Sequence, residues 1–132
     1  MLENKDYCDY DTCVALREVG CRIETEWYIH QPSYERGSCY LCFGIPRETS
    51  VLDECDYIPR LSLYEAQKWL REIHNIFVMI DRSFAASNSW HYVICANDDF
   101  EHLIEQPSLE NYSYEEALLE GIKEAVKILK EE

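Results

Sequence analysis

The sequence predicts a single α+β domain, a two-layer sandwich in which an antiparallel sheet carries helices on one face, with the order α-β-β-α-β-β(-β)-α. Two helix-start motifs, several alternating segments and one repeated pattern predict this class. The repeat joins residues 10–20, which read YDTCVALREVG, to residues 64–74, which read YEAQKWLREIH. Its matched arginines, Arg17 and Arg71, are expected on the outer side of their helices. The repeat allows two αββ units, which a third helix would close.

The length of 132 residues is that of one ordinary domain, which buries about two thirds of its unfolded surface. Hydrophobic residues make up 47% of the chain, which separates it from disordered proteins despite its high charge. We therefore expect one domain over residues 1–132, with an N-terminal tail at 1–9 and a long loop at 45–60.

Two helices are marked at their start by an S-x-x-E motif, in which the serine hydroxyl and the glutamate carboxylate each accept a hydrogen bond from the other's backbone amide. Ser62 and Glu65 open the first helix, and Ser113 and Glu116 open the second. Gly121 lies inside the second helix at a cost of about 1 kcal/mol, which a close approach to a strand would explain. The expected buried stripes are Leu63, Ala66, Trp69, Leu70 and Ile73, and Leu118, Ile122, Ala125, Val126 and Leu129.

A further helix is expected at about residues 11–19, ahead of the other two. The repeat places Cys8 at its capping position, so the N-cap must come from Asp9 or Asp11 instead. Gly20 follows the last helical residue and suits the left-handed conformation that often ends a helix.

Five segments are expected to form strands. Residues 76–82, IFVMIDR, are apolar on both faces, which predicts an interior strand. Residues 21–29 alternate and predict a half-exposed strand, with Arg22, Glu24 and Tyr28 on its polar face. A turn is expected at 97–99. The remaining strand candidates are residues 39–44, 90–96 and 100–104.

The net charge of −14 is distributed unevenly, because the stretch 83–122 contains no lysine or arginine. Such a surface repels a phosphate backbone, which argues against direct nucleic-acid binding, and attracts a basic protein partner. The alternative is that the charge serves solubility alone. The residues expected at the partner surface are Asp98, Asp99, Glu101, Glu105 and Glu110.

The cysteines favour a reduced, intracellular protein. There are seven, and the acidic start of the chain lacks the apolar segment of a secretory leader, so we expect free thiols in a cytoplasm. Cys39 and Cys42 form a single C-x-x-C pair, whereas a zinc site needs about four ligands. The longest apolar run, at 76–80, is far shorter than a membrane span, so no membrane partner is expected.

No motif of a common enzyme class is present in the sequence. The four glycines form neither G-x-G-x-x-G nor a phosphate-binding loop, which argues against the usual nucleotide enzymes. We expect no catalytic residue, cofactor or metal, although seven cysteines and four histidines leave a Cys- or metal-dependent enzyme as one alternative. A small-ligand or nucleotide-signal binding protein is another, with a pocket formed by Tyr34, Arg36, Tyr40 and Arg47.

Two segments carry a resemblance: LYEAQKWLREIHNIFVMI, and later YSYEEALLEGIKEAVKIL. They resemble a type of small protein common in bacteriophages and prophages of gut bacteria, over residues 10–20 and 58–130. No activity is assigned to that type, so the resemblance implies no catalytic residue. It favours a non-catalytic phage or prophage accessory protein that binds a host or phage protein, in its sharpest form an acidic inhibitor in defence evasion. Pairing of edge strands would make it a homo-oligomer.

Overall fold

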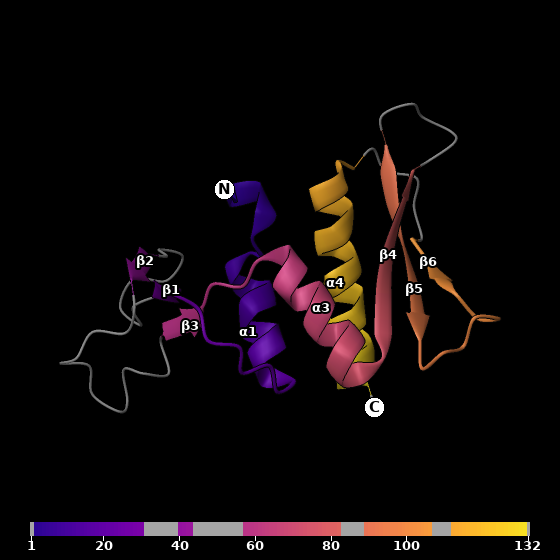
Figure 1. Cartoon of the computed structure of the whole chain (residues 1–132), viewed down its shortest axis with the longest axis horizontal. Helices are drawn as coiled ribbons and strands as arrows, with labels where there is room; N and C mark the ends of the chain where they lie inside the picture. Colours follow the sequence, from indigo (N-terminus) through magenta and orange to yellow (C-terminus); the bar gives the residue numbers. More distant parts are fainter. Residues whose placement is uncertain (1, 31–39, 44–56, 83–88, 107–111, 132) are drawn as a thin grey trace. The chain divides into compact units, whose positions relative to one another are not determined.

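The structure, a computed structural model, confirms the α+β class: helices are combined with antiparallel strands (Figure 1). The chain divides into two compact units, Cys8–Leu61 and the combination of Met1–Tyr7 with Ser62–Glu132. We call them the middle unit and the terminal unit. One domain over residues 1–132 stays a prediction. The structure describes residues 2–30, 40–43, 57–82, 89–106 and 112–131.

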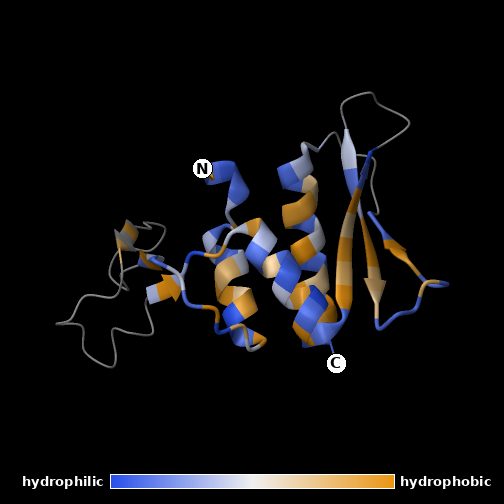
Figure 2. Cartoon of the chain, viewed as in Figure 1, coloured by the Kyte–Doolittle hydropathy of each residue, from blue (hydrophilic) through white to orange (hydrophobic). Residues whose placement is uncertain are grey.

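In the terminal unit, two helices cover one face of a three-stranded antiparallel sheet, which is the two-layer arrangement that the sequence predicts (Figure 1). Its elements are α3 (Leu63–His74), β4 (Ile76–Arg82), β5 (Trp90–Ala96), β6 (Ile104–Glu105) and α4 (Tyr114–Lys130). Helix α3 packs on β4, and α4 packs on both β4 and β5. Figure 2 shows β4 and β5 as largely hydrophobic, whereas both helices also carry hydrophilic residues.

Both S-x-x-E motifs cap their helices as predicted. At α3, Ser62 Oγ accepts a hydrogen bond from the Glu65 amide and Glu65 Oε1 accepts one from the Ser62 amide, both at 3.1 Å. Ser113 and Glu116 make the same pair of bonds at α4, at 3.2 Å. Asn75 ends α3 in the left-handed conformation, with φ of 55°. The start of each helix is therefore fixed by residues that are local in sequence.

The predicted buried stripe of α4 is confirmed except at Leu129, which is half-buried, and the stripe of α3 is wrong at one residue. Ile73 is 64% exposed, whereas Leu63, Ala66 and Leu70 are fully buried and Trp69 is half-buried. Ile73 belongs to the last turn of α3, just before Asn75 redirects the chain into β4, and no described element covers that side of the turn. In α4 the fully or nearly fully buried residues include Leu118, Ile122, Ala125 and Val126.

Strand β4 lies at the edge of its sheet, so the prediction of an interior strand is wrong for it. Among the described residues it pairs with β5 alone, and β5 is the central strand. Val78 lies on the helix-covered face, while Met79 lies on the other face and is 39% exposed. Apolar residues on both faces reveal how the two faces are covered but not how many neighbours a strand has, which explains the error.

Gly121 allows α4 to approach the sheet closely, as its place inside the helix suggests. A Cβ added at Gly121 would lie 2.6 Å from Val78 Cγ1 and 3.0 Å from Tyr92 Cβ. Real Cβ atoms do not approach other atoms this closely, so only glycine fits here without a shift of its neighbours. The helix axis is thereby set against β4 and β5.

The described residues of the middle unit form a helix and a second three-stranded antiparallel sheet (Figure 1). Its elements are α1 (Tyr10–Glu18), β1 (Trp27–His30), β2 (Tyr40–Phe43) and β3 (Tyr57–Pro59). The strand order is β2-β1-β3, and α1 packs on β3. The predicted long loop at 45–60 is therefore wrong at β3, a strand too short to show a period, and residues 44–56 lie outside the described part of the chain.

Helix α1 begins and ends with well-defined caps. Asp9 is the N-cap, and its Oδ1 accepts a hydrogen bond from the Thr12 amide at 2.9 Å. Gly20 has φ of +102°, and its amide donates to Arg17 O while the Cys21 amide donates to Leu16 O, which is the Schellman pattern. Because Cys21 belongs to this helix end, the strand predicted at 21–29 is restricted to β1.

The residues predicted as an N-terminal tail, 1–9, include a short 3-10 helix, η1 (Asn4–Asp6). Within the terminal unit, η1 contacts α4, and Tyr7 forms an isolated bridge with Ser62. Tyr64 of α3 donates a hydrogen bond to Asp6 Oδ1 at 2.8 Å. These contacts attach the start of the chain to the helix layer of the terminal unit.

Candidate functional site

The acidic segment, defined as residues 97–105, comprises the connection after β5 together with β6, and it begins with a tight turn. Asn97 and Asp98 both have left-handed backbones, with φ of 55° and 58°, and the Asp99 amide donates to Ala96 O at 3.1 Å. Two consecutive left-handed residues match the twist of a β-hairpin, although glycine usually takes one of the positions. The Asn97 amide also donates to Asn75 O at 3.1 Å, which attaches this turn to the end of α3.

The rest of the acidic segment is held by its own backbone. The Phe100 amide donates to Asp98 O at 3.1 Å, and the His102 amide donates to Asp99 O at 3.3 Å. His102 Nδ1 also lies 3.0 Å from each carboxylate oxygen of Asp99. At its far end, Ile104 and Glu105 pair with β5. The segment therefore has a defined conformation between two strands.

Apolar and acidic side chains are exposed together on the acidic segment. Phe100 is 69% exposed and Leu103 is 43% exposed. Four of the carboxylates predicted at a partner surface are exposed on the same segment, and the fifth, Glu110, lies outside the described residues. The exposed four are Asp98, Asp99, Glu101 and Glu105.

The sequence indicated the acidic residues but not the two apolar ones between them. FEHLI at 100–104 was expected to be a short return strand, yet the strand includes just Ile104 and Glu105. Phe100 and Leu103 lie before it and are exposed. A bulky apolar residue between carboxylates in a turn is the one signal that would have marked them.

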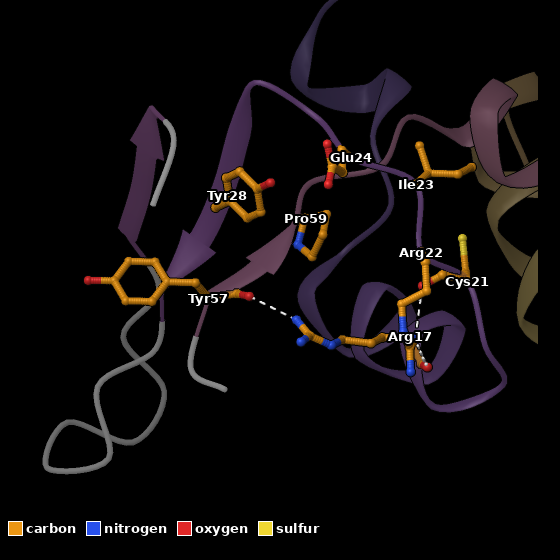
Figure 3. A pocket seen from close by; sticks show the side chains of 8 residues that line it. All are labelled: Arg17, Cys21, Arg22, Ile23, Glu24, Tyr28, Tyr57 and Pro59. Carbon is orange, nitrogen blue, oxygen red and sulfur yellow. Dashed lines mark hydrogen bonds between the residues drawn. The ribbon is translucent and has the colours of Figure 1, made fainter. Parts of the chain in front are cut away.

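A second candidate site is a pocket of the middle unit, with a volume of about 290 Å³ (Figure 3). One wall comes from the end of α1 and the residues after it, and the other comes from β1 and β3. Its lining residues are Arg17, Cys21, Arg22, Ile23, Glu24, Tyr28, Tyr57 and Pro59.

Two arginines bring positive charge to this pocket. Arg17 Nη1 donates a hydrogen bond to Tyr57 O at 3.0 Å, and Arg22 Nη1 donates to Arg17 O at 2.6 Å and to Cys21 O at 3.1 Å (Figure 3). Arg17 is half-buried and Arg22 is exposed. In the described part of the chain, neither guanidinium has a carboxylate oxygen within 4.0 Å. Both are therefore held by backbone carbonyls, and no described residue provides a counter-ion.

The strands supply a flat apolar surface to the same pocket. Tyr28 of β1 and Pro59 of β3 are direct cross-strand partners, so their side chains lie on one face of the sheet. The Tyr57 ring points away from Arg17 in Figure 3 and stacks on His30, with ring centroids 4.4 Å apart. Tyr57 thus contributes its carbonyl to the pocket, while Tyr28 contributes its ring.

The pocket differs in residues from the one that the sequence predicts. Tyr34, Arg36 and Arg47 lie outside the described residues, and Tyr40 lies on β2 with a side chain outside the description. The structure builds a pocket of the same chemistry, arginine with tyrosine, from residues that the sequence placed on outer faces. Because Arg22 and Glu24 precede β1 and are not part of it, the alternation assigned to 21–29 misplaced them.

The described cysteines are buried, and two of them form the hydrophobic staple of α1. Cys8 and Cys13 take the positions before the N-cap and four residues after it, and Cys13 Sγ lies 3.8 Å from Cys8 O. The hydrogen bond with Cys13, together with burial, raises the pKa of the Cys8 thiol, which keeps it protonated. Cys21 and Cys95 are also buried free thiols. Cys39, and the side chain of Cys42 on β2, lie outside the description.

The described residues contain neither a metal-site cluster nor a membrane-spanning helix. No cluster of three or more His, Cys, Asp or Glu side chains in them has the arrangement of a metal site. No helix among them has the length and the apolar character that crossing a bilayer requires. In the comparison with known proteins, no protein-family model, no curated protein and no solved structure matches this chain.

Proposed function

We propose that the protein is a non-catalytic binding protein whose acidic segment (97–105) docks on a basic protein partner. The observation that carries this proposal is the exposure of Phe100 and Leu103 among four carboxylates. Aromatic and aliphatic anchors supply most of the energy of an interface, and charged residues around them set the partner and the rate of association. The acidic segment combines both features.

The apolar residues can supply a large share of the energy of one contact. Complete burial of a Phe side chain contributes about 1.5 to 3 kcal/mol, and Phe100 is 69% exposed before binding. The backbone of the acidic segment is already ordered by its own hydrogen bonds, so little conformational entropy is lost when it docks. A partner with an apolar pocket inside a basic surface is the complement of this arrangement.

The negative charge of the acidic segment favours a partner that itself binds nucleic acid. A protein that itself binds nucleic acid presents lysines and arginines, and an acidic segment with an apolar tip would occupy that surface in place of the phosphate backbone. Together with the resemblance to phage and prophage proteins, this supports an accessory protein that inhibits a basic host protein. The proposal needs no catalytic residue.

Affinity capture from a bacterial extract tests the proposal, with quantitative mass spectrometry of the captured proteins. The Phe100→Ala variant should lose a basic protein that the unaltered chain retains, with affinity lowered about tenfold or more. Ile73→Ala is the matched control, because Ile73 is 64% exposed in the same unit but lies outside the acidic segment. Equal capture by both variants would remove the acidic segment from the interface.

A further inference from the structure

We infer that the pocket of the middle unit binds a mononucleotide-sized anion that carries both a phosphate and a planar ring. The pocket is separate from the acidic segment, since it lies in the other unit and uses none of the same residues. The inference therefore does not depend on the proposed function. It depends on the unpaired arginines, the flat apolar wall, the Glu24 carboxylate and the volume of the pocket.

Arg17 is a half-buried cation with an incomplete set of partners. A guanidinium has five N–H donors, and in the described structure Arg17 makes one hydrogen bond, to Tyr57 O. Removal of a charge from water is costly unless an opposite charge or further hydrogen bonds compensate it. A chain with a net charge of −14 has carboxylates to spare, yet none lies within 4.0 Å of Arg17 among the described residues. An anionic ligand would complete this site.

Arg22 places a second guanidinium at the same pocket. Its Nη1 is fixed by two carbonyls at the end of α1, those of Arg17 and Cys21. The other donors of Arg22 make no hydrogen bond within the described structure. Two guanidinium groups that line one pocket can both donate to a phosphate, which accepts several charge-assisted hydrogen bonds at once.

The remaining lining residues favour an organic anion over inorganic phosphate. Tyr28 and Pro59 form a flat surface on one face of the sheet, against which a planar ring can stack. Glu24 lines the pocket as well and accepts hydrogen bonds from amino or hydroxyl groups, but it repels a bare anion. Figure 3 shows Tyr28, Pro59 and Glu24 on the opposite side from Cys21 and Arg22. A ligand would therefore have an anionic end and a ring with polar hydrogens.

The size of the pocket limits the ligand. A volume of about 290 Å³ lies at the lower end of ligand pockets, which span about 300 to 1,000 Å³. This suits one planar base with a single phosphate and excludes enclosure of a dinucleotide cofactor. The 5′-ribonucleotide monophosphates are compounds of this size that combine a planar base with one phosphate.

Amide NMR titration of the complete protein tests this inference with the four 5′-ribonucleotide monophosphates as probes. At least one should give saturable shifts at the amides of residues 17, 22–24 and 28. Adenosine and inorganic phosphate are the partial probes, and each should bind at least tenfold more weakly than the monophosphate. No saturable shift with any monophosphate at millimolar concentration would overturn the inference, and so would equally tight binding of inorganic phosphate.

Matched variants assign the binding to this pocket. Arg17→Gln and Arg22→Gln should each weaken monophosphate binding about tenfold or more, because each removes a charge-assisted contact. Arg71→Gln is the control, since Arg71 holds the place of Arg17 in the repeat but is exposed on α3. The exposed Arg22 keeps the test valid if the amide spectrum shows that Arg17→Gln does not fold. Unchanged affinity in Arg22→Gln would contradict the inference.

Discussion

Gly121 of α4 lies against Val78 of β4 with no room for a side chain between them: an added Cβ would be 2.6 Å from Val78 Cγ1. Tyr92 of β5 closes the other side of the same space at 3.0 Å. This contact sets α4 against the two strands that lead into and out of the 83–88 stretch. At this contact, even the addition of one methyl group should change the free energy of unfolding.

We predict that Gly121→Ala destabilises the protein. Overpacking of a core costs about 1 to 3 kcal/mol, and the better helix propensity of alanine returns about 1 kcal/mol, so the net loss should be about 1 kcal/mol, within a range of about 0 to 2 kcal/mol. Urea unfolding measures the change in free energy. Adding Val78→Ala should reduce the cost of Gly121→Ala, because it removes the nearest atom. A gain in stability from Gly121→Ala alone would show that the close contact is absent.

A pH-dependent prediction comes from Asp6 and Tyr64. The Glu3 amide donates to the Asp6 carboxylate, and Tyr64 Oη donates to it at 2.8 Å, and these bonds hold the pKa of Asp6 below its ordinary value. Because the folded pKa is lowered, the stabilisation is present above the unfolded pKa and is lost as the pH falls through the folded pKa. Tyr64→Phe should move the pKa of Asp6 back toward its ordinary value, as measured by carbon NMR of the carboxyl group.

The same hydrogen bond should be visible from the tyrosine. The bond to Asp6, with burial, raises the pKa of Tyr64 to about 12. Asp6→Asn removes the negative charge beside the phenol, so the pKa of Tyr64 should fall toward that of an ordinary tyrosine. The change in the pKa of Tyr64 is measured by comparing the ultraviolet absorbance titration of this variant with that of the unaltered chain. Identical titration curves would contradict the contact between η1 and α3.

The structure decides between two caps that the sequence leaves open for α1. Asp9 accepts the hydrogen bond from the Thr12 amide, whereas Asp11 is an exposed residue of the first turn. Asp9→Ala should therefore lower the free energy of unfolding by about 1 kcal/mol. Asp11→Ala is the control with the same charge change, and its effect should be smaller. A larger loss for Asp11→Ala in denaturant titrations would reverse the assignment.

The helices could be predicted from the sequence because their signals are local in sequence. Ser62 with Glu65 and Ser113 with Glu116 satisfy each other's amides within one turn, so no distant residue is needed to predict them. Gly121 was informative because glycine destabilises the interior of a helix, so its presence there indicates a close contact. Leu16 and Leu70 hold the same position in the repeat and are both fully buried. The common positions of the repeat therefore mark the buried side of each helix.

Nonlocal features could not be read in this way. The edge position of β4 depends on which strands pair, and the exposure of Ile73 depends on where the covering elements end. Arg17 and Arg71 match in the repeat, yet Arg17 is half-buried in a pocket while Arg71 is exposed. The pocket itself joins the end of α1 to Pro59, residues that are far apart in the sequence. The pocket, and the exposure of Phe100 and Leu103 among the predicted carboxylates, therefore became visible with the fold.

The dependence of partner binding on ionic strength tests the central proposal most directly. For the basic protein captured through Phe100, the dissociation constant should rise steeply with salt, because the four exposed carboxylates of the acidic segment face its positive charges. The double variant Glu101→Gln/Glu105→Gln should flatten this dependence, whereas Glu72→Gln/Glu131→Gln, which removes two exposed carboxylates elsewhere, should leave it unchanged. An affinity that is indifferent to ionic strength would contradict the proposal.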